Sequence, residues 1–326
     1  MASRAKTRLI VNPIAANGKT AGRWPPIQEF LRTQGLDFDH VFTERPGHAT
    51  ELARQAVAEG CTLIVAVGGE GTLNEVVNGL VSPEGIVPPD VVLGMIPSGT
   101  GTDFVRTLGT PRDYLQACQH LLRAETIAVD LGEVEYAPLG PSAGSGQSLI
   151  SSHAHDQTGL AHRYFINVAG LGFDGEAAER ANRSSKALGG TITYLISLVI
   201  TLVSYQNKHV ELTLDGQTAP RRRLNSVIVS NGRYFGGGMF IAPHADLQDG
   251  LFDVIILGDL NKLEFAQNVP KVYNGTHLTH PKVEEYRARE VRVVSQERML
   301  IQAEGELLGM APATFRLLPQ AIQVKI

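Results

Sequence analysis

Cysteine, tryptophan and an excess of charge of one sign are all scarce in this chain of 326 residues. The two cysteines, Cys61 and Cys118, are too few for a disulfide framework and lack metal-binding spacing, which suits a reducing compartment. The net charge of −4 argues against general nucleic-acid binding. The longest apolar stretch, residues 188–205, includes two glycines and several hydroxyl side chains, so we expect no membrane span there. Because residues 1–7 lead directly into an expected strand, we also expect no signal peptide.

The first part of the chain alternates short apolar runs with amphipathic segments. This alternation is typical of repeated βα units, which form a parallel sheet with helices on both faces. We therefore predict an α/β domain over residues 1–126. Its expected strands are 8–11, 38–43, 63–67 and 91–96, and its expected helices are 25–33, 48–59 and 111–123, with another directly after residue 70.

The rest of the chain favours antiparallel strands, because many of its apolar segments alternate with polar residues. We predict a second domain over residues 127–326, an antiparallel β-sandwich with inserted helices whose last residues return to the first domain. Its expected strands are 126–136, 164–169, 209–214, 224–230, 251–257, 289–294 and 315–318, and its expected helices are 174–183, 192–205 and 262–273. Residues 137–159 are rich in Gly, Ser and Pro and are interpreted as a hairpin tip without an assigned function.

One glycine turn stands out, the sequence GGEGT at residues 68–72, which follows an apolar strand and precedes an amphipathic helix. Its glycines allow the backbone to approach a ligand closely, and the helix start offers N–H groups to an anion. Phosphate is the natural occupant of such a turn. A carboxylate at Glu70 would repel phosphate, so its presence indicates that a cation or a proton transfer is involved.

A second turn of the same kind, PSGTGTD, spans residues 97–103. It also follows an expected strand, and Thr102 or Asp103 could cap the helix that begins there. Either turn alone could be an ordinary βα connection. Because ligands bind at the carboxyl ends of parallel strands, two such turns at one sheet edge favour a phosphate site.

In this order, the motifs resemble those of the diacylglycerol kinase catalytic domain, as found in soluble bacterial diacylglycerol kinases and sphingosine kinase-like lipid kinases. The resemblance covers nearly the whole chain. It rests on NP at 12–13, GGEGTLNEV at 68–76, GMIPSGTGTDF at 94–104, FINVAGLGFD at 165–174, NGRYFGGGM at 231–239, APHADLQDGL at 242–251 and AEGE at 303–306.

The resemblance implies a fold of the NAD kinase and diacylglycerol kinase type, with ATP bound in the cleft between the two domains. The implied reaction transfers the γ-phosphoryl group to a lipid hydroxyl, by default that of diacylglycerol, giving phosphatidic acid. Such a transfer needs a phosphate cradle, Mg²⁺ and a carboxylate base. The residues that match nucleotide-binding positions are Asn12, Pro13, Thr43, Gly68, Gly69, Glu70, Gly71, Thr72, Asn74, Glu75 and Thr100.

Three positions depart from the family pattern. Glu304 matches the general base, and Glu70 matches a position in the first glycine motif, but the usual residue at both is Asp. Thr102 stands where Asn is usual. The longer side chains keep the charge but move the carboxylate by roughly an ångström, a displacement that can cost about 10²-fold in rate. Glutamate is nevertheless chemically competent as a base.

A metal site is also implied by the resemblance. Asp246, Asp249 and the carbonyl of Leu251 match the family's Mg²⁺ ligands, and oxygen ligands from one turn suit this hard cation. Asp103 and Glu306 match residues that link this site to the reaction centre, so the expected catalytic set is Glu304, Glu306, Asp103 and Glu70. From the residues alone, the interpretation of the segment 246–250 as a polar hairpin turn is favoured.

Two alternative functions remain at this stage. An NAD kinase-like enzyme acting on a soluble nucleotide shares the first glycine turn, and a silent lipid- or nucleotide-binding homologue would explain the changes at Glu70 and Glu304. For the favoured kinase we expect a lipid partner at the membrane surface, no nucleic acid, and a cytoplasmic location with transient contact to the inner face of the membrane. A homodimer follows from analogy only. The arginines at 221–223 are interpreted as a solvated strand end, and His244 as a hydrogen-bonded structural residue.

Overall fold

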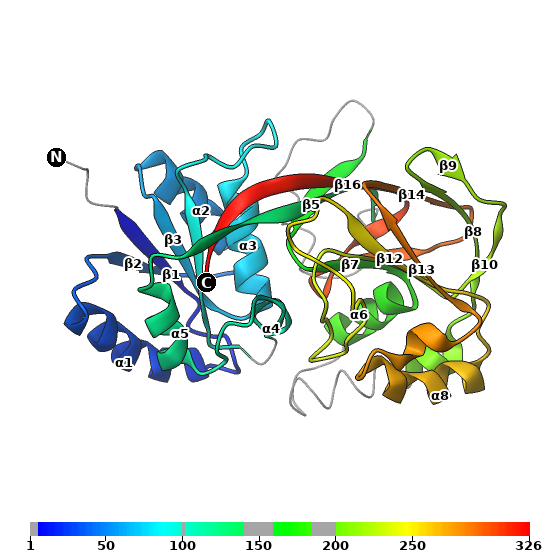
Figure 1. Ribbon diagram of the computed structural model, residues 1–326, viewed down its shortest axis with the longest axis horizontal. Coiled ribbons are helices and arrows are strands. Elements are labelled where there is room, and N and C mark those ends of the chain that lie inside the picture. Colours follow the sequence, from blue (N-terminus) through cyan, green and yellow to red (C-terminus); the bar gives the residue numbers. More distant parts are fainter. Residues whose placement is uncertain (1–5, 100–101, 140–158, 184–199) are drawn as a thin grey trace.

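The structure is a computed structural model that describes residues 6–99, 102–139, 159–183 and 200–326. Figure 1 shows two lobes joined by two long strands, β5 (Thr126–Pro138) and β16 (Glu306–Lys325). These two strands are antiparallel neighbours over most of their length, from Thr126 beside Lys325 to Pro138 beside Gly309. Thr100, most of 137–159 and most of 192–205 lie outside the described residues.

The first lobe is the predicted α/β domain, a parallel sheet in the order β2-β1-β3-β4. Its strands are β1 (Thr7–Val11), β2 (Asp39–Phe42), β3 (Leu63–Gly68) and β4 (Val92–Pro97). Its helices are α1 (Lys19–Thr33), α2 (His48–Ala58), α3 (Glu70–Leu80), α4 (Asp103–Leu108) and α5 (Tyr114–Leu121).

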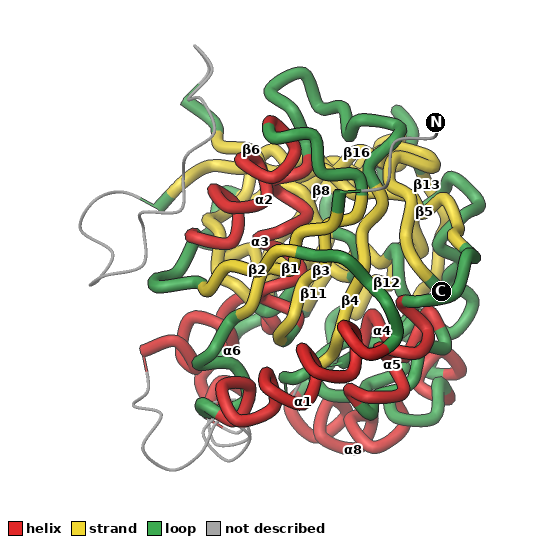
Figure 2. The backbone as a smooth tube through the Cα atoms, turned by 90° about the vertical axis from the view of Figure 1, so that its left-hand side faces the viewer, coloured by secondary structure: helices red, strands yellow, loops and turns green. Residues whose placement is uncertain are grey.

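Both faces of this sheet are covered by helices. Successive side chains of a strand point to opposite faces. Leu9 and Val11 accordingly join a buried cluster with Trp24 of α1, whereas Ile10 joins a different buried cluster with Leu73 of α3. Figure 2 shows α2 and α3 on one side of the strands and α1 and α5 on the other.

The second lobe is a β-sandwich with inserted helices, as predicted. Its strands are β6 (Ala161–Phe165), β7 (Val168–Gly172), β8 (Lys208–Leu214), β9 (Gln217–Thr218), β10 (Arg222–Leu224), β11 (Ser226–Ser230), β12 (Phe252–Leu257), β13 (Val283–Ala288), β14 (Glu290–Ser295) and β15 (Leu300–Ala303). Its helices include α6 (Phe173–Arg183), α8 (Lys262–Val272) and the 3₁₀ helix η3 (Thr276–Thr279). Phe165, Phe252 and Phe315 meet in its core, with ring centroids 5.7 and 6.2 Å from that of Phe165.

Strand β16 is far longer than the four residues predicted at 315–318. It pairs with β5, β14 and β15 in the second lobe, and its end pairs in parallel with β4, with Val324 beside Leu93. Strands β9, β13 and β15 were also absent from the prediction. Non-local pairing extends these strands through residues whose own alternation is weak.

Two further predicted elements differ clearly from the structure. Helix α1 begins at Lys19 instead of residue 25, so Pro25 and Pro26 lie inside the helix and do not start it. The strand predicted at 164–169 is wrong, because the chain bends at Ile166 and Asn167 between β6 and β7. The N–H groups of these two residues serve the functional site described below instead of a strand ladder.

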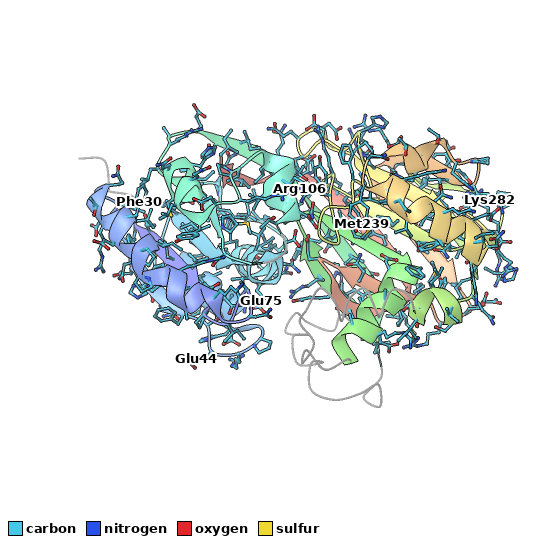
Figure 3. The ribbon with its side chains drawn as sticks, turned by 90° about the horizontal axis from the view of Figure 1, so that it is seen from below. Phe30, Glu44, Glu75, Arg106, Met239 and Lys282 are labelled. Atoms are coloured by element: carbon cyan, nitrogen blue, oxygen red, sulfur yellow. The ribbon has the colours of Figure 1, made fainter. Side chains whose placement is uncertain are left out.

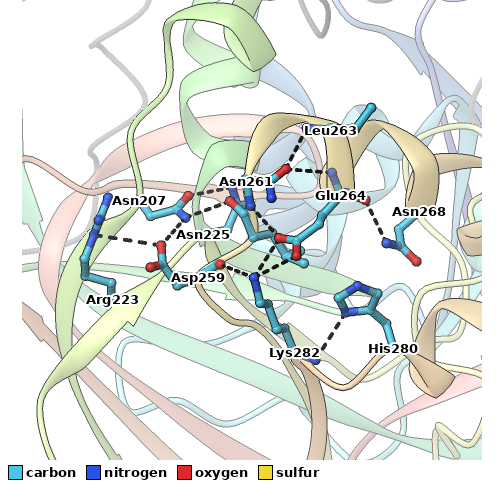
Figure 4. A network of polar contacts seen from close by, with 11 residues as sticks. Asn207, Arg223, Asn225, Asp259, Asn261, Leu263, Glu264, Asn268, His280 and Lys282 are labelled. Carbon is cyan, nitrogen blue, oxygen red and sulfur yellow. Dashed lines mark hydrogen bonds and ion pairs between the residues drawn. The ribbon is translucent and has the colours of Figure 1, made fainter.

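A polar network fastens α8 to the sandwich (Figure 4). Asn261 caps the helix and forms a capping box with Glu264, whose carboxylate also binds the ammonium of Lys282 at 2.7 Å. Arg223 lies 3.8 Å from Asp259 at the edge of this network, and Arg222 pairs with Glu284. These two arginines are therefore occupied by carboxylates of the protein. His244 contacts Glu285 at 3.0 Å, as a hydrogen-bonded residue should.

No helix within the described residues is both long enough and apolar enough to cross a membrane.

Candidate active site

The first glycine turn forms a compact loop between β3 and α3. Gly69 is the N-cap of α3 in an extended conformation, and the N–H groups of the first helical turn have no intrahelical partner. Gly68 must be a glycine, because a Cβ there would lie 2.6 Å from Oγ1 of Thr72. The carbonyl of Gly68 accepts the N–H groups of Ser98 and Gly99 at 2.8 and 3.1 Å, so the second glycine turn lies against the first.

Asn12 and Thr43 lie at the same edge of the sheet. Asn12 follows β1 and donates from Nδ2 to Oγ1 of Thr72 at 2.9 Å. Thr43 follows β2, and its N–H donates to the carbonyl of Val11. Pro13 is half-buried in the turn after Asn12. The structure thus brings these predicted nucleotide-binding residues to the carboxyl ends of the parallel strands, where α/β sheets bind ligands.

The side chain of Glu70 points toward the second glycine turn, at residues 97–103. Its Oε1 accepts the N–H of Asp103 at 2.7 Å and that of Phe104 at 3.3 Å, so the carboxylate caps α4. Burial and repulsion from Asp103 raise the pKa of Glu70 to about 7. The carboxyl group of Glu70, which would repel phosphate when ionised, therefore has a structural partner and a pKa near neutrality.

Asp103 connects the two lobes. It is 1% exposed and lies in the first lobe, and its Oδ2 accepts the N–H of Gly237, a residue of the second lobe, at 2.7 Å. Its Oδ1 has no hydrogen-bond partner within the described ranges. Burial raises the pKa of Asp103, against the hydrogen bond from Gly237 and the charge of Arg106. Figure 3 shows Arg106 near Met239 where the lobes meet, and Arg106 donates to the carbonyl of Gly238.

Glu304 lies in the two-residue turn between β15 and β16. Glu304 and Gly305 both have positive φ, 54° and 79°, as the central residues of a type I′ turn require. Oε1 of Glu304 accepts the N–H groups of Asn167 at 2.7 Å and Ile166 at 3.0 Å. Burial, with repulsion from Glu70, raises the pKa of Glu304 to about 8.

Glu306 follows that turn and lies beside the first glycine loop. Its Oε1 would be 3.4 Å from a Cβ placed on Gly71, and its Oε2 is 3.3 Å from Nη2 of Arg163. Desolvation raises the pKa of Glu306, and Arg163 opposes this rise. The four residues of the predicted catalytic set therefore influence one another electrostatically, although two come from each lobe.

Comparison with known proteins gives two family matches that together span most of the chain. Residues 6–134 match the diacylglycerol kinase catalytic domain, and residues 167–326 match the YegS C-terminal NAD kinase beta sandwich-like domain. Curated relatives align over almost the full length. The chain is 30% identical to a diacylglycerol kinase of Bacillus subtilis (strain 168) over 311 residues, which cover 95% of this chain and 92% of the relative.

The chain belongs to the diacylglycerol kinase family. A diacylglycerol kinase of Staphylococcus carnosus (strain TM300) is 29% identical over 98% of this chain and 95% of the relative. A crystal structure of a diacylglycerol kinase from Bacillus anthracis str. Sterne, 22% identical, covers 98% of this chain and 96% of that one, with a TM-score of 0.69. The structural likeness shows the fold, and the family places the chain among lipid kinases, which are phosphotransferases.

Two residues that match the family's nucleotide-binding positions have structural partners here. Both oxygens of Glu75 accept backbone N–H groups at the start of α2, from Gly47 at 2.9 Å and Ala49 at 3.1 Å. Asn74 is completely buried and accepts a hydrogen bond from Asn78. The contacts of Glu75 tie α3 to the start of α2, whereas the contact of Asn74 lies within α3. A nucleotide contact from either residue stays a prediction, as does one from Thr100, which lies outside the described residues.

The residues that match the family's metal site lie in an exposed turn before β12. Oδ1 of Asp246 accepts the N–H of Gln248, and Oδ1 of Asp249 accepts the N–H of Leu251, each at 3.0 Å. Oδ2 of Asp249 pairs with the guanidinium of Arg287. The described parts of the chain contain no group of three or more acidic, histidine or cysteine side chains arranged to hold a metal. A metal here would therefore use both carboxylates together with backbone oxygen and water.

Several residues of the site escaped the sequence analysis. Asn167 and Gly237 lie inside motifs that carry the family resemblance, FINVAGLGFD and NGRYFGGGM, which was the available signal. Arg163 and Asn78 had no such signal, because a strand arginine and a helix asparagine are common. Asn78 donates to the carbonyl of Tyr164 and accepts its N–H, which ties β6 to α3.

Proposed function

We propose that this protein is an ATP- and Mg²⁺-dependent kinase that transfers the γ-phosphoryl group to a lipid hydroxyl, with diacylglycerol as acceptor and phosphatidic acid as product. One observation carries the proposal. A carboxylate base, Glu304, is held by two backbone N–H groups and is coupled electrostatically to Glu70 in the glycine loop that would cradle the phosphates. Base and cradle come from different lobes, so a substrate between the lobes would meet both.

Glu304 is suited to accept the proton of an attacking hydroxyl. Two N–H donors fix its Oε1, which leaves Oε2 for the acceptor. A pKa of about 8 leaves a minority of Glu304 ionised at neutral pH, and that carboxylate is a stronger base than an ordinary glutamate. As the acceptor oxygen bonds to the γ-phosphorus, the bond to ADP breaks and the hydroxyl proton passes to Glu304. The N–H groups at the start of α3 are placed to bind the phosphate oxygens.

Mg²⁺ would neutralise charge on the transferred phosphates or support the site structurally. The oxygen donors of Asp246, Asp249 and the Leu251 carbonyl are the ligands that a hard cation prefers, and both aspartates are exposed. Arg287 competes for Asp249, so the ion pair would have to open when the metal binds at Oδ2. Asp103, held by Gly237 of the second lobe, would transmit the position of that lobe to α4.

The choice of acceptor rests on the relatives, which are named diacylglycerol kinases. Because that substrate resides in a bilayer, we place the reaction at the membrane surface, with the protein meeting its substrate from the water side. The NAD kinase alternative is less favoured, because the curated relatives align with both lobes and bear the lipid-kinase name. The silent-homologue alternative is opposed by the fixed position of Glu304.

The test is transfer of labelled phosphate from ATP·Mg²⁺ to diacylglycerol, monoacylglycerol, sphingosine, ceramide and phosphatidylglycerol in mixed micelles, with NAD as a soluble acceptor. The wild type is compared with Glu304→Gln and with Glu211→Gln, a control on the exposed face of β8. We expect phosphatidic acid from the wild type and the control, and none from Glu304→Gln. Labelled NADP would instead identify a nucleotide kinase. ATP binding without transfer to any acceptor would favour the silent homologue.

A further inference from the structure

The segment from Arg163 to Asn167 comprises the end of β6 and the bend that leads into β7, and it supports the reaction centre from the second lobe. The N–H groups of Ile166 and Asn167 hold Glu304, and the guanidinium of Arg163 pairs with Glu306. Between them, Tyr164 is fixed to α3 by two hydrogen bonds with the side chain of Asn78. One short segment therefore holds two of the catalytic carboxylates and is itself fastened to the first lobe.

Arg163 is a buried arginine whose described ion-pair partner is Glu306. Only 5% of its side chain is exposed, whereas 34% of the Glu306 side chain is exposed. Its Nε has no hydrogen-bond partner in the part of the chain that the structure describes. A buried guanidinium is costly unless it is paired, so this arginine needs a function that offsets its desolvation.

Glu306 is otherwise surrounded by negative charge. Glu75 of α3 acts on it across the lobe boundary, and Glu304 is coupled to it from the same turn. Arg163 is the cation that acts on Glu306 from β6. The carboxylate of Glu306 also lies against Gly71 of the glycine loop, because a Cβ added to Gly71 would contact Oε1 of Glu306 at 3.4 Å. Without a cation, this carboxylate would take up a proton or move away from the loop.

We propose that Arg163 is a positioning residue of the phosphoryl-transfer site, which pairs with the Glu306 carboxylate and keeps it in place against Gly71 of the glycine loop. The expected effect of Arg163 on the rate of phosphoryl transfer rests on the proposed function, whereas its expected effect on the pKa of Glu306 does not. On this inference, Arg163 is buried in order to position Glu306, and not only to pack in the core of the sandwich.

Loss of Arg163 has two opposite electrostatic consequences. The pKa of Glu306 rises, because the charge that opposes its desolvation is gone. Once Glu306 is neutral, its repulsion of Glu304 is lost, so the pKa of Glu304 falls toward that set by burial and Glu70. The acidic limb of the pH–rate profile, where activity rises as Glu304 loses its proton, would therefore move to lower pH, while the maximal rate drops because Glu306 is misplaced. If Arg163 were purely structural, its loss would change the free energy of unfolding without shifting the pKa of Glu306 or Glu304.

The test compares Arg163→Met, which removes the charge at similar length, with Arg163→Lys, which keeps it. Arg222→Met is the matched control, because Arg222 pairs with Glu284 at a distance from the site. Carboxyl ¹³C NMR of labelled Glu, assigned with Glu306→Gln, gives the titration midpoint of Glu306 in each protein. We expect Arg163→Met to raise that midpoint by about one pH unit or more, with most of the shift reversed in Arg163→Lys and none in Arg222→Met.

Kinetics with the lipid acceptor provide the second readout. We expect Arg163→Met to lower kcat by about 10- to 100-fold, with a shifted pH profile and partial rescue by lysine. Arg163→Met combined with Glu306→Gln should be no worse than the poorer single variant, because both act through one carboxylate. An unchanged Glu306 midpoint in a folded Arg163→Met protein would overturn the inference. If the wild type phosphorylated no lipid, the proposed function would fail, and the NMR titration would still decide the role of Arg163.

Discussion

Oε1 of Glu304 accepts the N–H of Asn167 at 2.7 Å, although the two residues are 137 positions apart in the chain. The same oxygen accepts the N–H of Ile166, so the carboxylate is held by the bend that interrupts β6 and β7. The carboxylate of this glutamate, one methylene longer than the usual aspartate, therefore has a specific pair of donors. This arrangement leads to the first prediction.

Restoring the residue that is usual in the family should impair this protein. Glu304→Asp withdraws the carboxylate by roughly an ångström from its two donors, and we expect kcat to fall by about 10²-fold. The positive φ of 54° at this position is easier for aspartate than for glutamate, so the variant should still fold. Steady-state kinetics and thermal unfolding together check this. A kcat equal to that of the wild type would show that the backbone adapts to side-chain length.

Stability should fall as pH rises from about 4.5 toward 8. The pKa of Glu70 is raised to about 7 and that of Glu304 to about 8, from 4.5 for the unconstrained group. Between these values the folded protein binds protons that the unfolded chain has released, so raising the pH favours unfolding. Urea unfolding at pH 6, 7 and 8 should show this decline, and Glu70→Gln with Glu304→Gln should flatten it. An unchanged slope in the double variant would assign the decline to other groups.

Gly68→Ala should abolish nucleotide binding because of a steric clash. The added Cβ would lie 2.6 Å from Oγ1 of Thr72, and relieving the contact must distort the loop, at a cost of about 1–3 kcal/mol. Gly22→Ala in α1 is the matched control, because a Cβ there meets nothing within 4 Å. We expect that control to stabilise the protein by about 0.5–1 kcal/mol and to bind ATP normally. Wild-type ATP affinity in Gly68→Ala would contradict the assignment of the loop.

Metal affinity should respond in opposite directions to two substitutions in and beside the exposed turn. Asp246→Asn removes a charged oxygen donor and should weaken Mg²⁺ binding, whereas Arg287→Gln releases Asp249 from its ion pair and should strengthen it. Activity measured against free Mg²⁺ concentration gives both effects as shifts of the half-saturating value. Shifts of the same sign, or none, would indicate that the turn at 246–251 is only a turn.

The α/β lobe was predictable from sequence because its strands and helices follow local patterns. Apolar runs such as 63–67 form strands, and glycine turns end them, whatever the distant residues are. Apart from the start of α1, the errors lie where long-range contacts decide the structure. Strand β16 is extended by pairing with β4, β5, β14 and β15, and the chain bends at Ile166 because two N–H groups bind Glu304.

The sequence by itself determined which residues occupy the glycine turns, the order of the motifs and the family, because turn sterics and motif spacing are local properties. Only the tertiary structure decided that Glu70 caps α4, that Glu304 is held by the β6–β7 bend and that Arg163 pairs with Glu306. The pKa of each of these carboxyl groups depends on burial and on charges brought near by folding. Such proximity between residues that lie 33 to 143 positions apart in the sequence is a property of the packed chain.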